Sequence, residues 1–391
     1  MERISLLGTM RDSADSLEHN LQLSSSAEKR WKLESPQLSP SCKRRWRYGR
    51  IIGIVISVCA TLVFVSFGIM HLVLVTRGHD SVSRAIYAQR MHACTPDREA
   101  YSVNQPTENT TPIPCHSHND YWRNKPLFDA IHAGCTSVEA DIWLDESNEA
   151  LQVGHSHKEL SQNRTLQKLY IEPLLGLLDR QNPADDNTTS GIFPMAPNQT
   201  LTLLLDFKTD PSALLAHVID ELEYLREQGF LSYCQDDRFV EGAVTVVATG
   251  DIPPSLFSQD SAHNRTIFTD VPLDKLEDFT TSFENATNPK VGPCSSHGGY
   301  YASTSFHSSI GSITRGSLSS DQVQLIRRQV AAAQRAGLKA RYWDTPSWPT
   351  SLRNYVWQTL IDEGVDVLNV DDLCYAAFLD WEAVPHKLID G

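Results

Sequence analysis

Residues 201–229 read LTLLLDFKTDPSALLAHVIDELEYLREQG, a predominantly apolar run followed by an amphipathic one. Residues 201–207 predict a strand that is buried on both faces, because parallel strands covered by helices are almost continuously apolar. Residues 211–229 carry apolar side chains at helical spacing and end at a glycine, which predicts a helix. A buried strand followed directly by a helix is the repeating unit of an α/β fold.

The same alternation of short apolar runs and helical patterns continues on both sides of this unit. Eight strands are predicted, at residues 113–118, 136–144, 201–207, 243–250, 265–270, 300–306, 338–343 and 365–370. Helices are predicted between them, at residues 128–134, 174–180, 211–229, 322–337 and 351–364. Eight such units in about 280 residues predict an α/β protein of the (β/α)8 TIM-type barrel class. A doubly wound open sheet is the alternative, but no G-x-G-x-x-G motif follows the first strand.

A second feature is the run IIGIVISVCATLVFVSFGIMHLVLV at residues 51–75, which holds no Lys, Arg, Asp or Glu. At about 1.5 Å per residue this run would extend about 37 Å, enough to cross a bilayer core of about 30 Å as a single transmembrane helix. Basic residues crowd the stretch from Lys43 to Arg50 just before it, and this bias predicts a cytosolic N-terminus. We therefore expect a signal-anchor and a single-pass type II membrane protein, with the distal part luminal or extracellular in the secretory pathway.

The predicted organisation has four parts. Residues 1–50 are expected to be a disordered cytosolic tail, 51–75 the transmembrane helix, 76–110 a stalk and 111–391 the barrel domain. Six of the eight cysteines follow the apolar run, where an oxidising compartment permits disulfides, although six cysteines allow fifteen pairings. All the Asn-x-Ser/Thr sequons also follow this run, which predicts a glycoprotein; they begin at Asn109, Asn163, Asn187, Asn198, Asn264 and Asn285.

The composition excludes some classes of function. The 391 residues include 34 Lys and Arg against 48 Asp and Glu, for a formal net charge of −14. This acidic balance provides no basic footprint, so nucleic acid is not expected as a partner. Eight cysteines in this length are too few for a disulfide-rich scaffold. The oligomeric state leaves no signature in the sequence.

Carboxylates gather at the ends of predicted strands, where barrel enzymes carry their catalytic groups. Glu139 and Asp141 share one face of the second strand, and their apolar neighbours face the other side. Two carboxylates inside a barrel repel each other unless a cation compensates them, and oxygen ligands favour Mg²⁺ or Ca²⁺. With Asp206 on the third strand they predict a divalent metal site. The alternative is a buried salt bridge of Lys208 with Glu139 or Asp141.

Histidines near the same strand ends suit proton transfer, because an unperturbed imidazole has a pKa of about 6.5. His118 on the first strand and His155 after the second are predicted to flank a metal-bound substrate as general base and acid. His116 and His157 are weaker candidates, as metal ligands, supporting residues or surface residues. Lys208 is expected to neutralise an anionic oxygen of the substrate.

Several of these residues belong to longer motifs that occur in order. They are HSHNDYWRNKPLFDAIHAGC (116–135), TSVEADIWL (136–144), VGHSHKEL (153–160), LLLDFKTD (203–210), RYWDTPSWP (341–349) and GVDVLNVDDL (364–373). In these motifs the sequence resembles the fungal altered inheritance of mitochondria protein 6 family, which belongs to the phospholipase C-like phosphodiesterases. More distantly it is similar to glycerophosphodiester phosphodiesterases and to sphingomyelinase D enzymes.

This resemblance implies roles for individual residues. His118 matches the first catalytic histidine, with His116 as its rival in a second possible alignment, and His155 matches the second histidine. The E-x-D pair on the second strand matches the metal ligands, and the D-x-K on the third strand is shared as well. Trp343 and Asn369 occupy strand ends where relatives place substrate-contacting groups. The arginine that follows the first histidine in glycerophosphodiesterases is absent here, so a glycerophosphodiester substrate is not implied.

These observations together predict an enzyme, a metal-dependent phosphoric diester hydrolase that acts on a phospholipid-type phosphodiester or its head group. The expected cofactor is a divalent cation, Mg²⁺ or Ca²⁺. One alternative is a zinc-dependent amidohydrolase-type barrel, in which the H-x-H of His116 and His118 would join Asp371 and His307. The other alternative is a non-catalytic membrane-anchored binding protein.

Overall fold

A computed structural model describes residues 54, 56–66, 68, 107–108, 110–145, 150–183, 189–253, 256, 265–276, 291–314, 316–379 and 381. The chain divides into two units, Met1–Ile86 and Tyr87–Gly391. In the first unit, the described residues 54, 56–66 and 68 are helical. Across the described ranges, no helix combines the length and the apolar character needed to cross a membrane. The other residues of the predicted transmembrane segment, the whole predicted tail and nearly all of the predicted stalk lie outside these ranges.

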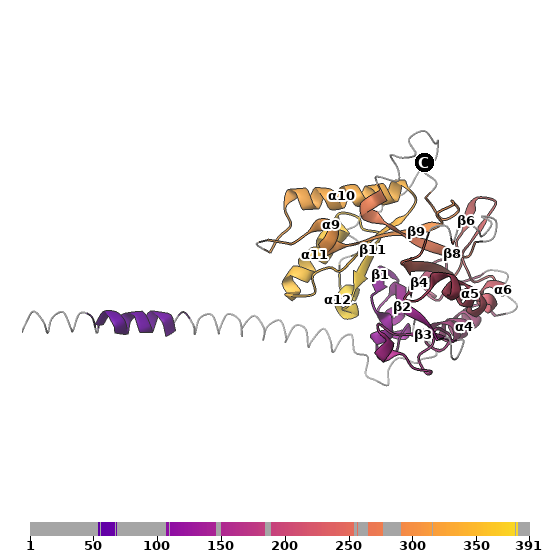
Figure 1. Cartoon of the computed structure of the whole chain (residues 1–391), viewed down its shortest axis with the longest axis horizontal. Coiled ribbons are helices and arrows are strands. Elements are labelled where there is room, and N and C mark those ends of the chain that lie inside the picture. The colour runs from indigo at the N-terminus through magenta and orange to yellow at the C-terminus, as the bar shows by residue number, and fades with distance from the viewer. Residues whose placement is uncertain are drawn as a thin grey trace, which may run out of the picture. The chain divides into compact units, whose positions relative to one another are not determined.

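The second unit is a closed barrel of parallel strands, as the sequence predicted (Figure 1). The strands follow the order β1-β11-β10-β9-β8-β7-β4-β2, and pairing of β1 with β2 closes the ring. The barrel strands are β1 (Ile113–Ser117), β2 (Cys135–Asp145), β4 (Leu201–Phe207), β7 (Val244–Gly250), β8 (Ile267–Pro272), β9 (Gly299–Ser305), β10 (Lys339–Trp343) and β11 (Val367–Val370). This closure rules out the doubly wound open sheet, in which two strand edges would stay unpaired.

All eight predicted barrel strands are present, but three short strands were not predicted. β3 (Ala150–Val153) pairs antiparallel with the end of β2, and β5 (Tyr233–Gln235) forms a hairpin with β6 (Arg238–Val240). The hairpin of β2 and β3 carries the chain back toward the barrel mouth, so the segment after β3 lies beside the end of β2.

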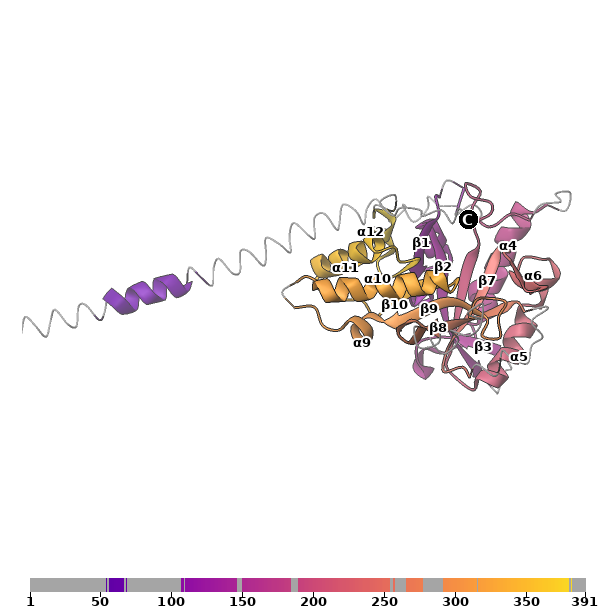
Figure 2. The same ribbon diagram turned by 90° about the horizontal axis from the view of Figure 1, so that it is seen from above.

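Helices cover the outside of the barrel, with α4 to α6 on one side and α10 to α12 on the other (Figures 1 and 2). They are α3 (Phe128–His132), α4 (Glu172–Gln181), α5 (Pro211–Glu221), α6 (Glu223–Glu227), α9 (Phe306–Ile310), α10 (Ser320–Arg335), α11 (Thr350–Asp362) and α12 (Leu373–Ala377). Short helical turns are η1 (Asp120–Trp122), η2 (His157–Glu159), η3 (Gln167–Ile171) and η4 (Leu273–Lys275). Local sequence sets the helix starts: the Ser319 hydroxyl accepts the Gln322 N–H, and the Gln322 side chain accepts the Ser319 N–H, which is a capping box for α10.

The core has an outer layer between strands and helices and a smaller inner cluster. Val138, Ala140 and Ile142 of β2 are fully buried in the outer layer, as the alternation predicted. The inner cluster comprises Leu204, Cys234, Val247, Phe268, Tyr300, Tyr301 and Val367. Leu204 lies two residues before Asp206 on the same face of β4, so apolar side chains fill the barrel directly below the acidic residues.

Two disulfides join the described cysteines, whose pairing the sequence left open. Cys115 and Cys135 connect β1 to β2, and Cys234 and Cys294 connect β5 to the segment before β9. Cys374 is disulfide-bonded as well. The bond between β1 and β2 joins the strand of His116 to the strand of Glu139 and Asp141.

Candidate active site

The three predicted metal-binding carboxylates meet at one end of the barrel. Glu139 and Asp141 point inward from β2, and Asp206 points inward from β4 in direct register with Asp141. Each residue contributes a carboxylate oxygen to a group whose atoms all lie within 4.8 Å of one another. Glu139 is 6% exposed and Asp141 is 1% exposed, so two of the three are removed from water. We refer to these three residues as the acidic cluster.

Charge in the acidic cluster is only partly balanced. Burial raises the pKa of Asp141 to about 6, and the charges of Glu139 and Asp206 add to this shift. Burial also raises the pKa of Asp206, against the opposing effect of Lys208. Burial disfavours ionised Glu139 too, but the neighbouring His116 ring and Arg341 hold its pKa below the usual range. A hard divalent cation fits this oxygen-only donor set, because it would stabilise the ionised form of all three groups.

Lys208 lies against two members of the acidic cluster. Its Nζ atom is 2.5 Å from Asp206 Oδ2 and 3.1 Å from Asp141 Oδ2. Burial alone would lower the pKa of Lys208, but the Asp206 carboxylate outweighs burial and raises it, so the ammonium stays charged. The salt bridge considered as an alternative is thus present with Asp141, although its other partner is Asp206 rather than Glu139. One ammonium cannot balance three carboxylates.

His118 stands beside the acidic cluster, directly after the last residue of β1. Its side chain is 28% exposed, its Nδ1 atom is 2.8 Å from Asp371 Oδ1, and its Nε2 atom is 3.8 Å from Glu139 Oε2. The hydrogen bond to Asp371 overcomes burial and raises the pKa of His118. Because Asp371 occupies Nδ1, Nε2 is the nitrogen that remains for proton transfer.

His116, its rival in the sequence comparison, lies deeper in the barrel. The side chain is fully buried, and Nδ1 is hydrogen-bonded to Ser137 Oγ at 2.6 Å. Nε2 has no hydrogen-bond partner among the described residues and is 3.7 Å from Glu139 Oε2. Burial lowers the pKa of His116 to about 4, so its ring is neutral near pH 7. The geometry therefore favours His118 over His116 for proton transfer.

His155 reaches the other side of the acidic cluster. It follows β3, and its Nδ1 atom is 3.3 Å from Asp141 Oδ2 and 3.3 Å from the Tyr121 hydroxyl. Its side chain is 53% exposed, so solvent or a ligand can contact it. His157 instead packs against Trp143, with ring centroids 4.2 Å apart and the two rings tilted by 54°. The structure thus brings together His118, His155 and the acidic cluster.

The two predicted substrate-contacting residues differ in exposure. Asn369 is 4% exposed, and its side-chain oxygen accepts a hydrogen bond of 2.9 Å from Arg341 Nη1. Trp343 is 42% exposed and lines a pocket of about 340 Å³ at the ends of β7 to β10. Asn369 is therefore buried against Arg341, whereas Trp343 is open to a ligand; their predicted contact with substrate stays a prediction.

Sequence reasoning missed Arg341 and Asp270. Arg341 points into the barrel, 3% exposed, with Nε donating to Ser303 Oγ at 3.0 Å and Nη2 lying 3.7 Å from Asp270 Oδ2. The alternation of the predicted strand 338–343 carried a usable signal, because Arg341 and Trp343 share a face. Asp270 ends its strand much as Asp206 does, but nothing local indicated its partner.

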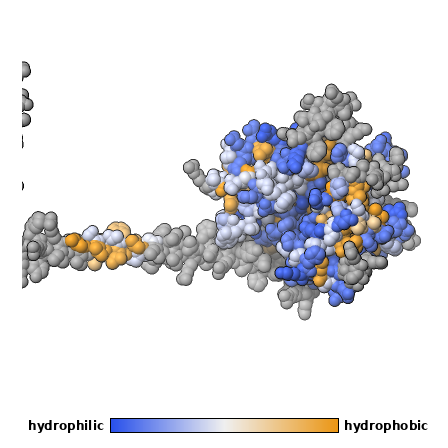
Figure 3. Space-filling view, viewed as in Figure 1, coloured by the Kyte–Doolittle hydropathy of each residue, from blue (hydrophilic) through white to orange (hydrophobic). Residues whose placement is uncertain are grey.

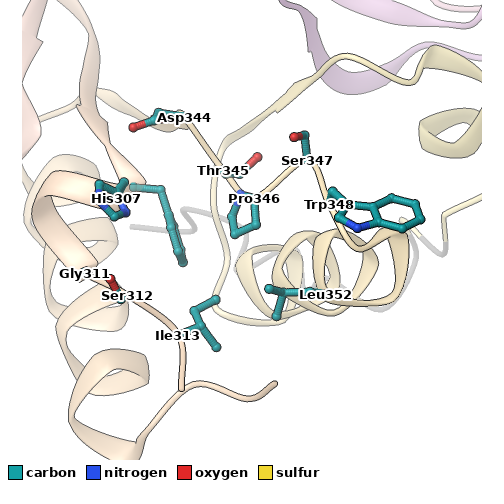
Figure 4. A pocket seen from close by; sticks show the side chains of 11 residues that line it. His307, Gly311, Ser312, Ile313, Asp344, Thr345, Pro346, Ser347, Trp348 and Leu352 are labelled. Carbon is teal, nitrogen blue, oxygen red and sulfur yellow. The ribbon is translucent and has the colours of Figure 1, made fainter. Parts of the chain in front are cut away.

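A second pocket, of about 350 Å³, lies between α9 and the segment that follows β10. Figure 4 shows His307 and Asp344 on one side of this pocket and Trp348 on the other, around Ile313 and Leu352. The amidohydrolase alternative required His307 to join a zinc site. Within the described part of the chain, the group with metal-binding geometry consists of carboxylates alone, and His307 belongs to this separate pocket.

Comparison with known proteins agrees with the motifs. Residues 104–270 match the AIM6-like phosphodiesterase domain. A protein named Altered inheritance of mitochondria protein 6 homolog, from Arthroderma benhamiae, is 40% identical over 281 residues, which cover 68% of this chain and 83% of that protein. The chain belongs to the altered inheritance of mitochondria protein 6 family. The family member from Lachancea thermotolerans is 35% identical over 326 residues, covering 77% of this chain and 74% of that protein.

The altered inheritance of mitochondria protein 6 of Saccharomyces cerevisiae is 33% identical over 289 residues, covering 70% of this chain and 72% of that protein. Among solved structures, a Ca²⁺-dependent phosphatidylinositol-specific phospholipase C from Streptomyces antibioticus matches with a TM-score of 0.32 and 12% identity, covering 69% of this chain and 97% of that chain. The family assignment and the phosphodiesterase domain confirm the resemblance that the motifs predicted.

Proposed function

We propose that this protein is a metal-dependent phosphoric diester hydrolase that cleaves a phospholipid-type phosphodiester. The observation that carries the proposal is the acidic cluster, with one accessible histidine beside Glu139 and another beside Asp141. The phosphodiesterase domain of the family supports the same reaction class. The non-catalytic alternative has no observation in its favour.

In the proposed cleavage, the acidic cluster, His118 and His155 each have a separate role. A divalent cation held by Glu139, Asp141 and Asp206 would polarise a nonbridging phosphoryl oxygen and stabilise the charge that develops on it. His118, oriented by Asp371, takes the proton of the attacking hydroxyl at Nε2. His155, on the far side of the cluster, gives a proton to the leaving oxygen.

Lys208 and the nucleophile complete the proposed reaction. The ammonium of Lys208, which lies between Asp141 and Asp206, contacts a further phosphoryl oxygen of the bound substrate. The nucleophile is either water or a hydroxyl group of the substrate itself, and the second would give a cyclic phosphate.

We also propose the topology that the sequence predicts, with residues 51–75 as a membrane anchor and the barrel on the luminal or extracellular side. The Cys115–Cys135 and Cys234–Cys294 disulfides support it, because such bonds persist in oxidising compartments. Two sequon asparagines that the structure describes, Asn163 and Asn198, are exposed, as glycan acceptors must be. An anchor of this kind would hold the site close to lipid substrates.

The test is hydrolysis of a panel of phosphodiester lipids by the purified full-length protein in detergent micelles, followed by product mass. Activity should require Mg²⁺ or Ca²⁺ and disappear with a chelator. Glu139→Gln keeps the size of the side chain but removes its charge, and it should reduce kcat/KM at least about a hundredfold.

The matched control is Glu223→Gln, which changes a partly exposed glutamate of α6 in an ion pair with Arg226. It should hydrolyse the lipids at the wild-type rate. Equal rates for wild type and Glu139→Gln, or activity that a chelator leaves untouched, would overturn the metal-dependent mechanism.

A further inference from the structure

The pocket of about 340 Å³ at the ends of β7 to β10 adjoins the acidic cluster directly. Gly250 lines this pocket, and a Cβ atom placed on it would lie only 2.9 Å from Asp206 Oδ1. Thr249, its neighbour in the pocket wall, pairs in register with Asp206. A substrate whose phosphate lies at the cluster would therefore place one of its substituents in this pocket.

Asp270 in the pocket wall has one carboxylate oxygen that its internal partners leave unpaired. Its side chain is 5% exposed, and its Oδ1 atom has no hydrogen-bond partner among the described residues. A buried carboxylate oxygen without a donor is destabilising, and such atoms are rare in folded proteins. The register of β8 against β9 shifts between Thr269 and Asp270, and both residues line the pocket as a result.

The polar groups around Asp270 suit hydroxyl ligands. Thr249 Oγ1 donates to Asp270 Oδ2 at 3.2 Å, and Thr269 Oγ1 donates to the backbone carbonyl of His297 at 2.7 Å, so both hydroxyl oxygens keep lone pairs that can accept. Ser303 Oγ accepts from Arg341 at 3.0 Å, and its own hydroxyl is hydrogen-bonded to Asp270. A ligand hydroxyl can donate to Asp270 Oδ1 and to the lone pairs of the two threonine hydroxyls.

The charge of the pocket argues against a cationic ligand. Arg341 Nη2 is 3.7 Å from Asp270 Oδ2, so the negative charge of Asp270 is already balanced inside the protein. Trp343 is the one Trp, Tyr or Phe among the pocket residues that the structure describes, whereas quaternary ammonium groups are bound in cages of several aromatic rings.

We propose that this pocket is the head-group subsite of the enzyme, and that it selects uncharged, hydroxyl-bearing (polyol) head groups over choline-type or ethanolamine-type ones. This inference rests on the proposed phosphodiesterase function and adds the substrate class to it. Asp270 and Thr249 contact the hydroxyls of the head group, and Trp343 covers the open side of the pocket.

The test measures binding, so that it does not depend on turnover. Inositol 1-phosphate, glycerol 1-phosphate, phosphocholine and phosphoethanolamine are titrated by calorimetry into the full-length protein in detergent micelles with Mg²⁺ or Ca²⁺. At least one of the two polyol phosphates should bind about tenfold or more tightly than phosphocholine and phosphoethanolamine. Choline has no N–H or O–H to donate, so it leaves buried polar atoms unpaired, and Arg341 already balances the Asp270 charge that the ethanolamine ammonium would otherwise meet.

Two variants and one control assign any preference to the pocket. Asp270→Asn and Thr249→Val should each weaken polyol phosphate binding about tenfold while phosphocholine affinity stays within about twofold. Thr249→Val keeps the Asp270–Arg341 pair, so it still tests the subsite if Asp270→Asn does not fold. Asp274→Asn, at an exposed position just beyond β8, should bind all four compounds like the wild type.

Phosphocholine binding as tight as that of both polyol phosphates, equal weakening of all four compounds in the two variants, or no binding of any of them would overturn the inference. A clear polyol preference together with no hydrolysis of any lipid would leave the subsite in place and remove the proposed reaction. The two proposals can therefore fail separately.

Discussion

The hydrogen bond between His118 Nδ1 and Asp371 Oδ1 fixes the direction in which the imidazole presents Nε2. Asp371 is held in turn, because the Arg123 guanidinium donates to its backbone carbonyl at 2.6 Å. Asp371→Asn should lower kcat about 10-fold to 100-fold with little change in KM, since the amide no longer stabilises a charged ring. Asp371→Glu, which restores the carboxylate, should recover part of this loss. Steady-state kinetics that show a change in KM alone would assign Asp371 to substrate binding instead.

Glu221 is a titratable group far from any proposed chemistry. Its Oε1 atom accepts the Leu151 N–H at 3.4 Å, and Oε2 is buried without a hydrogen-bond partner in the described part of the chain. Burial raises the pKa of Glu221 to about 7. The folded protein therefore binds this proton more tightly than the unfolded chain, where the pKa is about 4.3, and stability falls as pH rises from about 4.3 to about 7.

Glu221→Gln cannot ionise and should remove this fall. Urea denaturation at pH 8 should find the variant about 1–2 kcal/mol more stable than wild type, a value reduced for the partial exposure of the side chain. The difference should vanish near pH 4. Glu223→Gln, two positions further along the chain, should instead follow the wild-type curve. Parallel curves for wild type and Glu221→Gln would show that Glu221 ionises normally.

Strand alternation identified the acidic cluster and the residues nearest to it. The patterns E-x-D and D-x-K each put two inward-facing side chains on one strand, so local sequence was sufficient for Glu139, Asp141, Asp206 and Lys208. The pair of Asp270 and Arg341 could not be found in this way, because its two members come from β8 and β10 and meet only when the barrel closes. Buried pairs across a barrel depend on topology rather than on spacing.

At the scale of elements, long apolar or amphipathic segments were predictable and short ones were not. The strand at 201–207 and the helix α10 appear at the predicted places, since their patterns extend over enough residues to give a clear period. β3 has four residues and β5 and β6 have three each, too few for a period to be recognised. β3 matters to the site, because it returns the chain so that His155 reaches Asp141.

The disulfide between β1 and β2 links the strand of His118 to the strand of Glu139. It joins cysteines 20 residues apart in sequence, both fully buried. Replacing both with Cys115→Ala and Cys135→Ala should lower the free energy of unfolding by about 3 kcal/mol, because the unfolded chain is no longer restrained. Urea denaturation measures this loss. Cys59→Ala removes a free, exposed cysteine of the other unit and serves as the control. An unchanged urea midpoint for the double variant would mean that barrel packing alone holds β1 and β2 together.

At the scale of the whole molecule, the part of the chain after residue 50 carries the acidic charge, and the coloured residues on the face of the barrel unit seen in Figure 3 are mainly hydrophilic. Residues 1–50 have 10 Lys and Arg against 6 Asp and Glu, a balance of +4. The remaining residues therefore have a balance of −18, and the two parts add up to the net charge of −14. This asymmetry matches the proposed topology, in which the basic segment stays in the cytosol. In the proposed reaction, a substrate phosphate would therefore be attracted by local cations such as Lys208 and not by the field of the acidic barrel unit.

Glycosylation of the barrel unit is the most direct consequence of the proposed topology. Asn163 and Asn198 are exposed sequon residues on the barrel unit, so both should carry glycans if that unit enters the secretory pathway. Glycosidase treatment of the protein from its native host should increase its electrophoretic mobility, and Asn163→Gln and Asn198→Gln should each remove one step of that shift. Gln replacement at Asn182, whose side chain is hydrogen-bonded within the barrel and which begins no sequon, should leave the number of steps unchanged. A protein whose mobility is the same before and after treatment would place the barrel on the cytosolic side, and the two disulfides would then need another oxidant.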